Sequence, residues 1–167
     1  SGSRDASRDA GDVIASYEGM PYNNRGMVWV EDNLYVIDND YGYLRIYSIY
    51  DSTLVQEAYY PLNYGSYGIT YDGEYLWIGD YSGGAIRAYT LDGSYTGTYF
   101  SSPVSDENAL TYDGEYFIVH DWNQNNPTIY RVDHSGNIIE SFYANINNMR
   151  AYQSVWVQDH DDGHLWV

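Results

Sequence analysis

The chain has 167 residues, enough for one domain with a hydrophobic core, and it contains no cysteine, which excludes disulfide bonds, thiolate metal sites and a cysteine nucleophile. Its 24 acidic and 7 basic residues give a net charge of −17, which disfavours nucleic acid and anionic membranes as partners. No apolar run is long enough to cross a bilayer, so we expect no membrane insertion. The acidity fits either a salt-adapted protein or a soluble extracellular domain.

The first segment of the chain is polar and differs in composition from the rest. Residues 1–12 contain Ser-Arg-Asp-Ala twice, and we expect a disordered linker or a cloning remnant there. Residues 13–167 make up the expected folded domain. Within it, residues 13–17 are predicted as an outermost strand that precedes the first repeat.

The folded part repeats itself every 41 residues. The segment Tyr-Asp-Gly-Glu-Tyr at 71–75 recurs at 112–116, and Asp51, Asp92 and Asp133 keep the same spacing. Because this segment and these aspartates share one spacing of 41 residues, the chain is expected to consist of structural repeats. A period in the low forties that is built from short β-type runs is typical of propeller blades, because one such sheet cannot bury both of its faces without neighbours.

Each copy predicts four short strands that are joined by tight Asp-Gly, Asn or Gly turns. In the first copy, Leu34–Ile37 aligns with Tyr75–Ile78 of the second. We therefore predict an all-β fold of four-stranded antiparallel blades, forming a partial or truncated β-propeller. The expected strands are 27–30, 34–37, 44–49 and 54–60, then 68–71, 75–79, 85–91 and 95–100, then 109–112, 116–120, 128–132 and 138–143, followed by 154–158 and 164–167 as the first two strands of a fourth unit.

The second copy carries a resemblance to a known group of proteins. The run from Tyr71 to Asp80, followed by Ala85–Tyr89 and Leu91-Asp92-Gly93, resembles the blades of NHL, YVTN and gluconolactonase-like propellers. The resemblance covers residues 13–167 and implies the propeller fold. It does not select one activity, because such blades serve as scaffolds, adhesion modules, ligand sensors and enzymes.

Acidic residues recur after the second strand of each copy, where propeller loops converge on one face. The matching positions are Asn39 (flanked by Asp38 and Asp40), Asp80 and Asp121. Carboxylate and amide oxygens are the ligands that Ca²⁺ takes. In gluconolactonase-like propellers such inner residues hold a divalent metal, so the resemblance implies a candidate Ca²⁺ site at Asp80, Asp121, Glu107 and Asn108. The alternative, which we favour, is that each aspartate caps a turn by accepting backbone N–H groups.

A ligand surface is predicted from aromatic residues in the same loops. Trp122 and Asn123 lie in a long polar loop, and Tyr81 lies in the corresponding loop of the second copy. An exposed aromatic ring there could stack on a sugar or a peptide. The alternative for each tryptophan is packing between blades. His120 ends a strand and is predicted to be a partly buried structural histidine.

Together these features predict an extracellular or cell-surface binding or scaffold module, with no catalysis by this chain alone. The expected partners are a protein or carbohydrate ligand and, because a half-finished ring leaves an open edge, a second copy that completes it. No cofactor is firmly expected apart from the candidate Ca²⁺. The alternative is a truncated, metal-dependent hydrolase of the lactonase type.

Overall fold

The computed structural model describes residues 16–17, 19–20, 22–51, 53–62, 65–81, 83–105, 107–121, 128–143, 153–157 and 164–166. These residues form strands and turns, and none of them lies in a helix. The described part of the chain accordingly offers no helix that could span a membrane. The expected linker at 1–12 lies outside the described residues, as does most of the expected strand at 13–17, whose last two residues are not in a strand.

Three four-stranded antiparallel sheets follow one another along the chain, and a two-stranded sheet comes after them. We call the first three sheets blades 1 to 3 and the last one the fourth sheet. Blade 1 contains β1 (Asn24–Val30), β2 (Asn33–Asp38), β3 (Tyr43–Tyr50) and β4 (Thr53–Pro61); blade 2 contains β5 (Ser66–Tyr71), β6 (Leu76–Asp80), β7 (Ala85–Tyr89) and β8 (Tyr95–Ser101); blade 3 contains β9 (Glu107–Tyr112), β10 (Phe117–Asp121), β11 (Thr128–Val132) and β12 (Ile138–Tyr143); the fourth sheet contains β13 (Val155–Trp156) and β14 (Leu165–Trp166).

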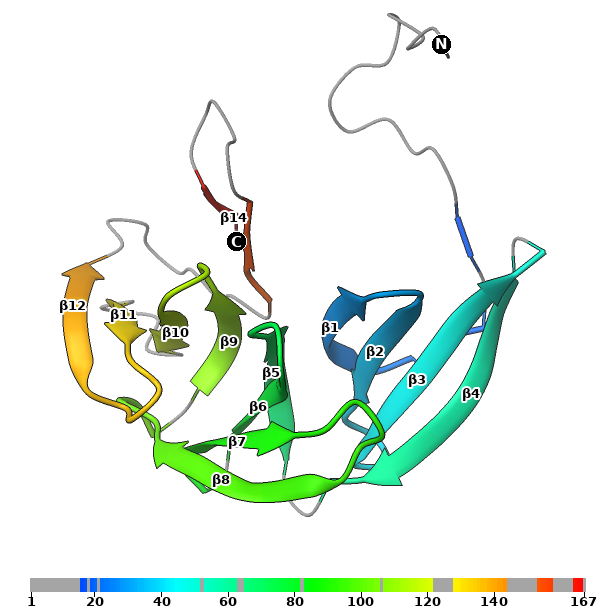
Figure 1. Ribbon diagram of the computed structural model, residues 1–167, viewed down its shortest axis with the longest axis horizontal. Helices are drawn as coiled ribbons and strands as arrows, with labels where there is room; N and C mark the ends of the chain where they lie inside the picture. Colours follow the sequence, from blue (N-terminus) through cyan, green and yellow to red (C-terminus); the bar gives the residue numbers. More distant parts are fainter. Residues whose placement is uncertain are drawn as a thin grey trace, which may run out of the picture.

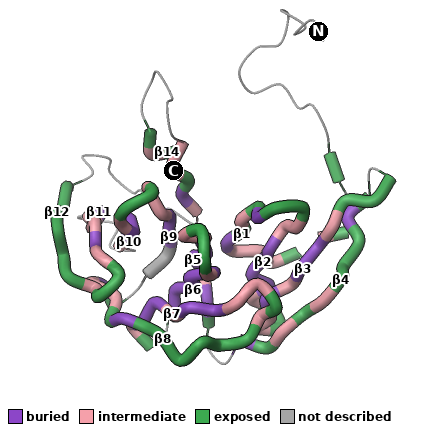
Figure 2. The backbone as a smooth tube through the Cα atoms, viewed as in Figure 1, coloured by how far each residue is buried: buried purple, intermediate pink, exposed green. Residues whose placement is uncertain are grey.

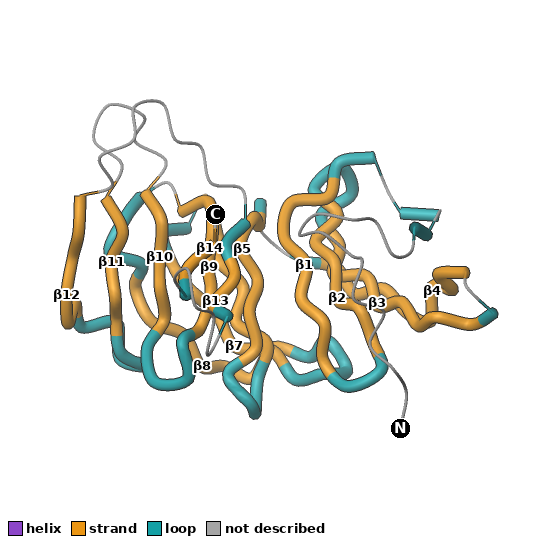
Figure 3. The backbone as a smooth tube through the Cα atoms, turned by 90° about the horizontal axis from the view of Figure 1, so that it is seen from above, coloured by secondary structure: helices purple, strands orange, loops and turns teal. Residues whose placement is uncertain are grey.

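The sheets are arranged around a common centre. The first strands β1, β5 and β9 lie side by side on the inside, and the last strands β4, β8 and β12 lie outside (Figure 1). The fourth sheet sits beyond β9, and Figure 3 shows β4 and β12 at opposite ends of the arc. This arrangement confirms the predicted all-β partial propeller with antiparallel four-stranded blades.

Aspartate and glycine set the first hairpin of blades 2 and 3. The carboxylate of Asp72 accepts hydrogen bonds from the backbone N–H groups of Glu74 and Tyr75, both at 2.8 Å. Asp113 accepts the equivalent pair in blade 3. Gly73 has a φ of 105°, a left-handed value that side chains disfavour, so the recurring Asp-Gly pair is required by the turn.

The hydrophobic core lies between the blades. Tyr35 and Ile37 of blade 1 pack with Leu76 and Ile78 of blade 2. On the other face of β6, the Trp77 ring lies 5.0 Å from that of Phe117 in blade 3. Figure 2 shows exposed positions along β8 and β12, because an outer strand has the least contact with its neighbours.

The first copy is offset by one residue from the alignment that its sequence predicts. Tyr35 of blade 1 packs toward blade 2, and Trp77 of blade 2 packs toward blade 3, so these two residues are equivalent. The predicted alignment instead matches Tyr35 with Leu76. A slip of one residue sends every side chain of a strand to the opposite face, so the facing residues decide the register. Asp38, and not Asn39, is therefore the counterpart of Asp80, and the predicted equivalence of Asn39 is wrong.

His120 is buried near the end of β10, with no hydrogen-bond partner for either ring nitrogen among the described residues. Its backbone pairs with Ala109 on one side and Ile129 on the other. Burial lowers the pKa of His120 from 6.5 to about 4. The prediction of a partly buried histidine thus understates its burial: the ring stays neutral because the surrounding site excludes water.

Replacing Asp72 with alanine should lower the free energy of unfolding by about 2 to 3 kcal/mol. The carboxylate also accepts from the indole N–H of Trp77 at 2.7 Å, so the substitution leaves the partly buried donors of Tyr75 and Trp77 unpaired. Burial alone would raise the pKa of Asp72, but the backbone N–H groups of Tyr75 and Glu74 and the Trp77 indole hold it below the usual value. Urea unfolding of Asp72→Ala and of the matched control Glu74→Ala measures the effect. Equal losses for the two variants would contradict this role of Asp72.

The protein should lose stability in acid through His120. His120 has a pKa of 6.5 in the unfolded chain and of about 4 in the folded protein. Its contribution to the free energy of unfolding is therefore complete above pH 6.5 and is lost as the pH falls from 6.5 to about 4. At about pH 4.5 the loss should be about 2.5 kcal/mol relative to pH 7.5. His120→Leu should lack this component in urea unfolding at the two pH values. A pH dependence identical to that of the unchanged protein would contradict the assignment.

Candidate ligand-binding site

A cavity of about 490 Å³ lies at the centre of the molecule, where the inner strands meet the segment that leads into the fourth sheet. Three inner strands and this segment each contribute part of its wall. The lining residues are Met27, Val28 and Trp29 from β1, Ile69, Thr70 and Tyr71 from β5, Thr111 and Tyr112 from β9, and Gln153, Ser154, Val155 and Trp156.

Gln153 ties the cavity wall together. Its side-chain amide donates to the carbonyl oxygens of Met27 in β1 and Ile69 in β5, at 3.3 and 3.4 Å. The backbone N–H of Trp156 donates to the Thr111 hydroxyl at 3.1 Å, which fixes the same segment to β9. Gly26 permits this closeness, because a Cβ there would lie 2.5 Å from the carbonyl oxygen of Tyr67. The segment that leads into the fourth sheet is therefore held against β1, β5 and β9 by hydrogen bonds between side chains and backbone.

Two polar atoms of this wall are buried without a hydrogen-bond partner among the described residues. They are Oε1 of Gln153 and Oγ of Ser154. A buried acceptor or hydroxyl that is left unpaired costs about 1 to 3 kcal/mol, and native proteins keep few of them. Both residues line the cavity, while the two unpaired atoms themselves have almost no accessible surface and lie behind its wall.

The rest of the wall is aromatic and uncharged. Trp29 is half-exposed, and its indole N–H donates to the Glu31 carbonyl at 2.7 Å, which fixes the ring. Burial, followed by the charges of Asp72, Asp113 and Glu115, raises the pKa of Tyr112, so its hydroxyl remains a donor. None of the described lining residues is charged, although the chain carries −17. The cavity suits a neutral ligand with an apolar face and hydrogen-bonding groups.

The acids that follow the second strands of blades 1 and 2 are engaged in ion pairs. Asp38 pairs with Arg45 at 2.6 Å, and Asp80 pairs with Arg87 at 3.4 Å. Asp80 also accepts the backbone N–H of Gly83 at 2.8 Å, where a Cβ would lie 2.0 Å from its carboxylate. Asp80 thus caps its turn, as the alternative interpretation predicts, and its buried carboxylate pairs with the partly buried Arg87.

The other predicted metal ligands lie in blade 3. Asp121 is half-buried, and its backbone lies opposite Glu107 in the β9–β10 ladder. Blade 3 has Tyr130 at the position of Arg87. Arg87 pairs with Ile78 in blade 2, and Tyr130 pairs with Val119, the equivalent residue of blade 3. The side chains of Glu107 and Asn108 lie outside the described residues. In the described part of the chain no three acidic or histidine side chains gather, and the Ca²⁺ site stays a prediction.

The predicted ligand-binding residues do not line the cavity. Trp122 and Asn123 lie outside the described residues. The Tyr81 ring packs on Tyr67, with 4.8 Å between centroids, and it is partly exposed elsewhere on blade 2. Sequence reasoning missed Trp29 and Gln153 as site residues. The available signal was that the first strand of every blade faces the centre of a propeller.

No protein-family model matches this sequence, and a search of curated proteins finds no match. Solved structures do match. The chain is similar to a glutaminyl cyclase from Myxococcus xanthus (15% identity, TM-score 0.59, 71% of this chain and 51% of that one) and to virginiamycin B lyase from Staphylococcus aureus (21%, 0.58, 86% and 47%). It is also similar to a chain of a nidogen–laminin complex (17%, 0.60, 80% and 52%).

The chain spans about half the length of these solved proteins, each of which is a propeller. At identities this low the likeness concerns the fold, which agrees with the blades described above. It confirms the propeller fold that the repeat Tyr71–Asp80 predicts by its resemblance to NHL, YVTN and lactonase-like blades: the chain is built of β-propeller blades.

Proposed function

We propose that this chain is an extracellular or cell-surface binding module that takes its ligand in the central cavity and performs no catalysis by itself. The observation that carries the proposal is the uncharged and partly aromatic wall that the described residues give that cavity, in which Trp29 is 49% exposed. The volume of about 490 Å³ is within the range of small-molecule and sugar sites.

A neutral carbohydrate is the ligand class that the wall favours. The half-exposed Trp29 ring can stack on the apolar face of a sugar ring, and Thr70, Thr111 and Gln153 can bond its hydroxyl groups. A charged ligand would gain nothing from the described lining residues. Protein binding is the second candidate, since one similar propeller was solved in the nidogen–laminin complex.

The lactonase-type hydrolase remains the alternative function, and Ca²⁺ is the cofactor that we propose for it. The backbone pairing of Asp121 with Glu107 supports this alternative, because it places two acids on neighbouring strands at one end of blade 3. A hydrolase of this kind would use the metal to polarise a carbonyl oxygen. The capped and paired state of Asp80 makes that residue a poor ligand.

Trp29→Ala should weaken binding of a neutral oligosaccharide at least about tenfold, because stacked aromatic rings dominate such sites. A glycan array on the unchanged protein selects the sugar, and titration calorimetry compares the variants. Tyr50→Ala, which removes an exposed aromatic ring from the outer end of blade 1, is the matched control. Equal affinity of Trp29→Ala and the control would contradict the assignment of the cavity; binding of a peptide in place of sugars would favour the second candidate.

Monovalent salt and Ca²⁺ should each raise the midpoint temperature of thermal unfolding, but they should act at different concentrations. Monovalent salt should act at tens to hundreds of millimolar, on the scale at which the Debye length falls to about 10 Å and the repulsion that arises from the net charge of −17 is screened. A Ca²⁺ site should act well below that range, be reversed by a chelator and be lost in Asp121→Asn. Differential scanning calorimetry with NaCl or CaCl₂ measures both effects. If Ca²⁺ does not change the midpoint temperature of unfolding, the proposal of a metal-dependent hydrolase is contradicted.

A further inference from the structure

In each of blades 1 and 2, one arginine pairs with a buried aspartate and lies among tyrosine rings. In blade 1, the guanidinium carbon of Arg45 lies 5.8, 5.6 and 6.0 Å from the ring centroids of Tyr41, Tyr43 and Tyr59. The rings also contact one another: Tyr41 stacks on Tyr43 with 6.3 Å between centroids, and Tyr43 packs on Tyr59 at 5.0 Å. We call Arg45 and these three tyrosines the tyrosine patch of blade 1.

Blade 2 repeats this arrangement at matching positions. Arg87 lies opposite Tyr99 in the β7–β8 ladder, as Arg45 lies opposite Tyr59 in the β3–β4 ladder. The guanidinium carbon of Arg87 lies 5.5 Å from the ring centroid of Tyr99 and 6.0 Å from that of Tyr95. We call these three residues the tyrosine patch of blade 2. The patch is therefore a feature that the repeat carries from one blade to the next.

The tyrosines of the outer strands are exposed even where a neighbouring blade is present. Tyr59 in β4 is 55% exposed. Tyr99 holds the same position in β8 and is 59% exposed, although blade 1 covers that face of blade 2 at Ile78 and Tyr89. In blade 1 the inner part of the same face is likewise buried, at Val36. The exposure of Tyr59 is thus a property of the outer strand and does not depend on what precedes blade 1.

Asp38 holds the patch of blade 1 in place. Its carboxylate accepts hydrogen bonds from the backbone N–H groups of Asp40 and Tyr41 at 3.1 and 3.3 Å, and from the Nε–H group of Arg45 at 2.7 Å. One buried side chain therefore positions both the arginine and the turn that carries Tyr41, whose ring is 71% exposed. Side chains that are ordered before binding lose less entropy when a partner arrives.

The charge of the chain indicates which partner the rings can take. Arg45, Arg87 and Arg131 are each paired with a buried aspartate, so their charges are neutralised and offer little to an anion. The chain as a whole carries −17, and the exposed Asp40 precedes Tyr41 in the same turn. An acidic surface attracts cations, and the face of a tyrosine ring binds the cationic groups of arginine and lysine.

We propose that the tyrosine patches of blades 1 and 2 are a docking surface for a protein partner that presents arginine or lysine side chains. The cations of the partner lie on the exposed rings of Tyr41, Tyr59 and Tyr99, and the net charge of −17 steers the partner toward them. Tyrosine is also a residue type that contributes strongly to protein interfaces. The surface is separate from the central cavity, because none of these tyrosines belongs to the described lining of that cavity.

Titration of the full chain with a fluorescently labelled oligoarginine peptide tests the proposal. The double variant Tyr41→Ala/Tyr59→Ala should bind about fivefold to thirtyfold more weakly than the unchanged protein, because two cation–π contacts are lost. Tyr41→Phe/Tyr59→Phe keeps the ring faces and should keep the affinity. Tyr50→Ala is the matched control, since Tyr50 is an exposed ring of β3 that lies on the opposite face of the sheet from Arg45.

These variants all keep the net charge, so the general attraction of a cationic peptide to an acidic protein is the same in each. Circular dichroism and thermal melts show that they stay folded, and Tyr95→Ala/Tyr99→Ala in blade 2 should give a loss of the same size. The measurement involves neither Trp29 nor a sugar, so it succeeds or fails independently of the proposed function. Equal affinity of both alanine pairs and the control overturns the proposal, as does tighter binding of a proline-rich peptide that has no basic residue.

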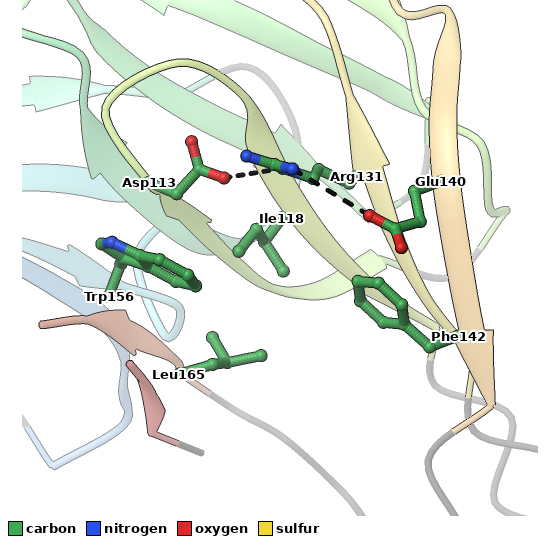
Figure 4. A pocket seen from close by; sticks show the side chains of 7 residues that line it. All are labelled: Asp113, Ile118, Arg131, Glu140, Phe142, Trp156 and Leu165. Atoms are coloured by element: carbon green, nitrogen blue, oxygen red, sulfur yellow. Dashed lines mark hydrogen bonds and ion pairs between the residues drawn. The ribbon is translucent and has the colours of Figure 1, made fainter. Parts of the chain in front are cut away.

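The same rings distinguish this surface from the other pocket of the molecule. Trp156 and Leu165 of the fourth sheet point toward Ile118 and Phe142 of blade 3, around a space of about 270 Å³ (Figure 4). That pocket contains no tyrosine among its described residues, and its one arginine, Arg131, pairs with acids on the same blade. The alanine pairs in blades 1 and 2 therefore leave it unchanged, and a loss of peptide binding in them reports on the tyrosine patches.

Discussion

The structure depends on face-to-face packing of neighbouring sheets. A blade of four short strands has two broad faces, and neither can be buried by the blade alone. Leu76 and Ile78 are buried only because blade 1 lies on them, and Trp77, on the opposite face, is buried only because blade 3 lies there. The alternation of apolar residues along β6 therefore serves two interfaces at once. The same constraint explains why the chain needs several copies of one unit.

This dependence also accounts for the two ends of the arc. Met27 and Trp29 at one end and Trp166 at the other have the chemistry of interface residues and the exposure of surface residues. The centre of the molecule follows the same rule, since its cavity is walled by the inner strands that the packing brings together.

The fold could be predicted from the sequence because the turn residues repeat. The Asp-Gly pairs at 72–73 and 113–114 fix the first hairpin of two blades, and the apolar alternation between them identifies the strands. The first copy lacks this pair and uses Glu31 in a left-handed conformation, with a φ of 53°. Without that anchor the alignment slipped by one residue, and Asn39 was matched to Asp80 in place of Asp38.

The candidate site could not be predicted in the same way. Gln153 bonds to Met27, 126 residues earlier in the chain, and only the closing of the blades around a centre brings the two together. Sequence reasoning gave weight to acids, because repeated carboxylates indicate metal sites. In blades 1 and 2 these acids instead neutralise Arg45 and Arg87, a role that requires knowledge of which strand lies beside which.

Native-state hydrogen exchange on Trp77→Ala tests the central role of blade packing most directly. The substitution removes the side chain that joins blade 2 to blade 3 and changes no backbone hydrogen bond of either ladder. If packing between blades holds the fold, amides of β9 and β10 should lose protection together with those of β5 and β6, because the blades unfold as one unit. Loss of protection that stays confined to β6 and its two neighbours in blade 2 would show that each sheet is stable by itself, and would contradict the account.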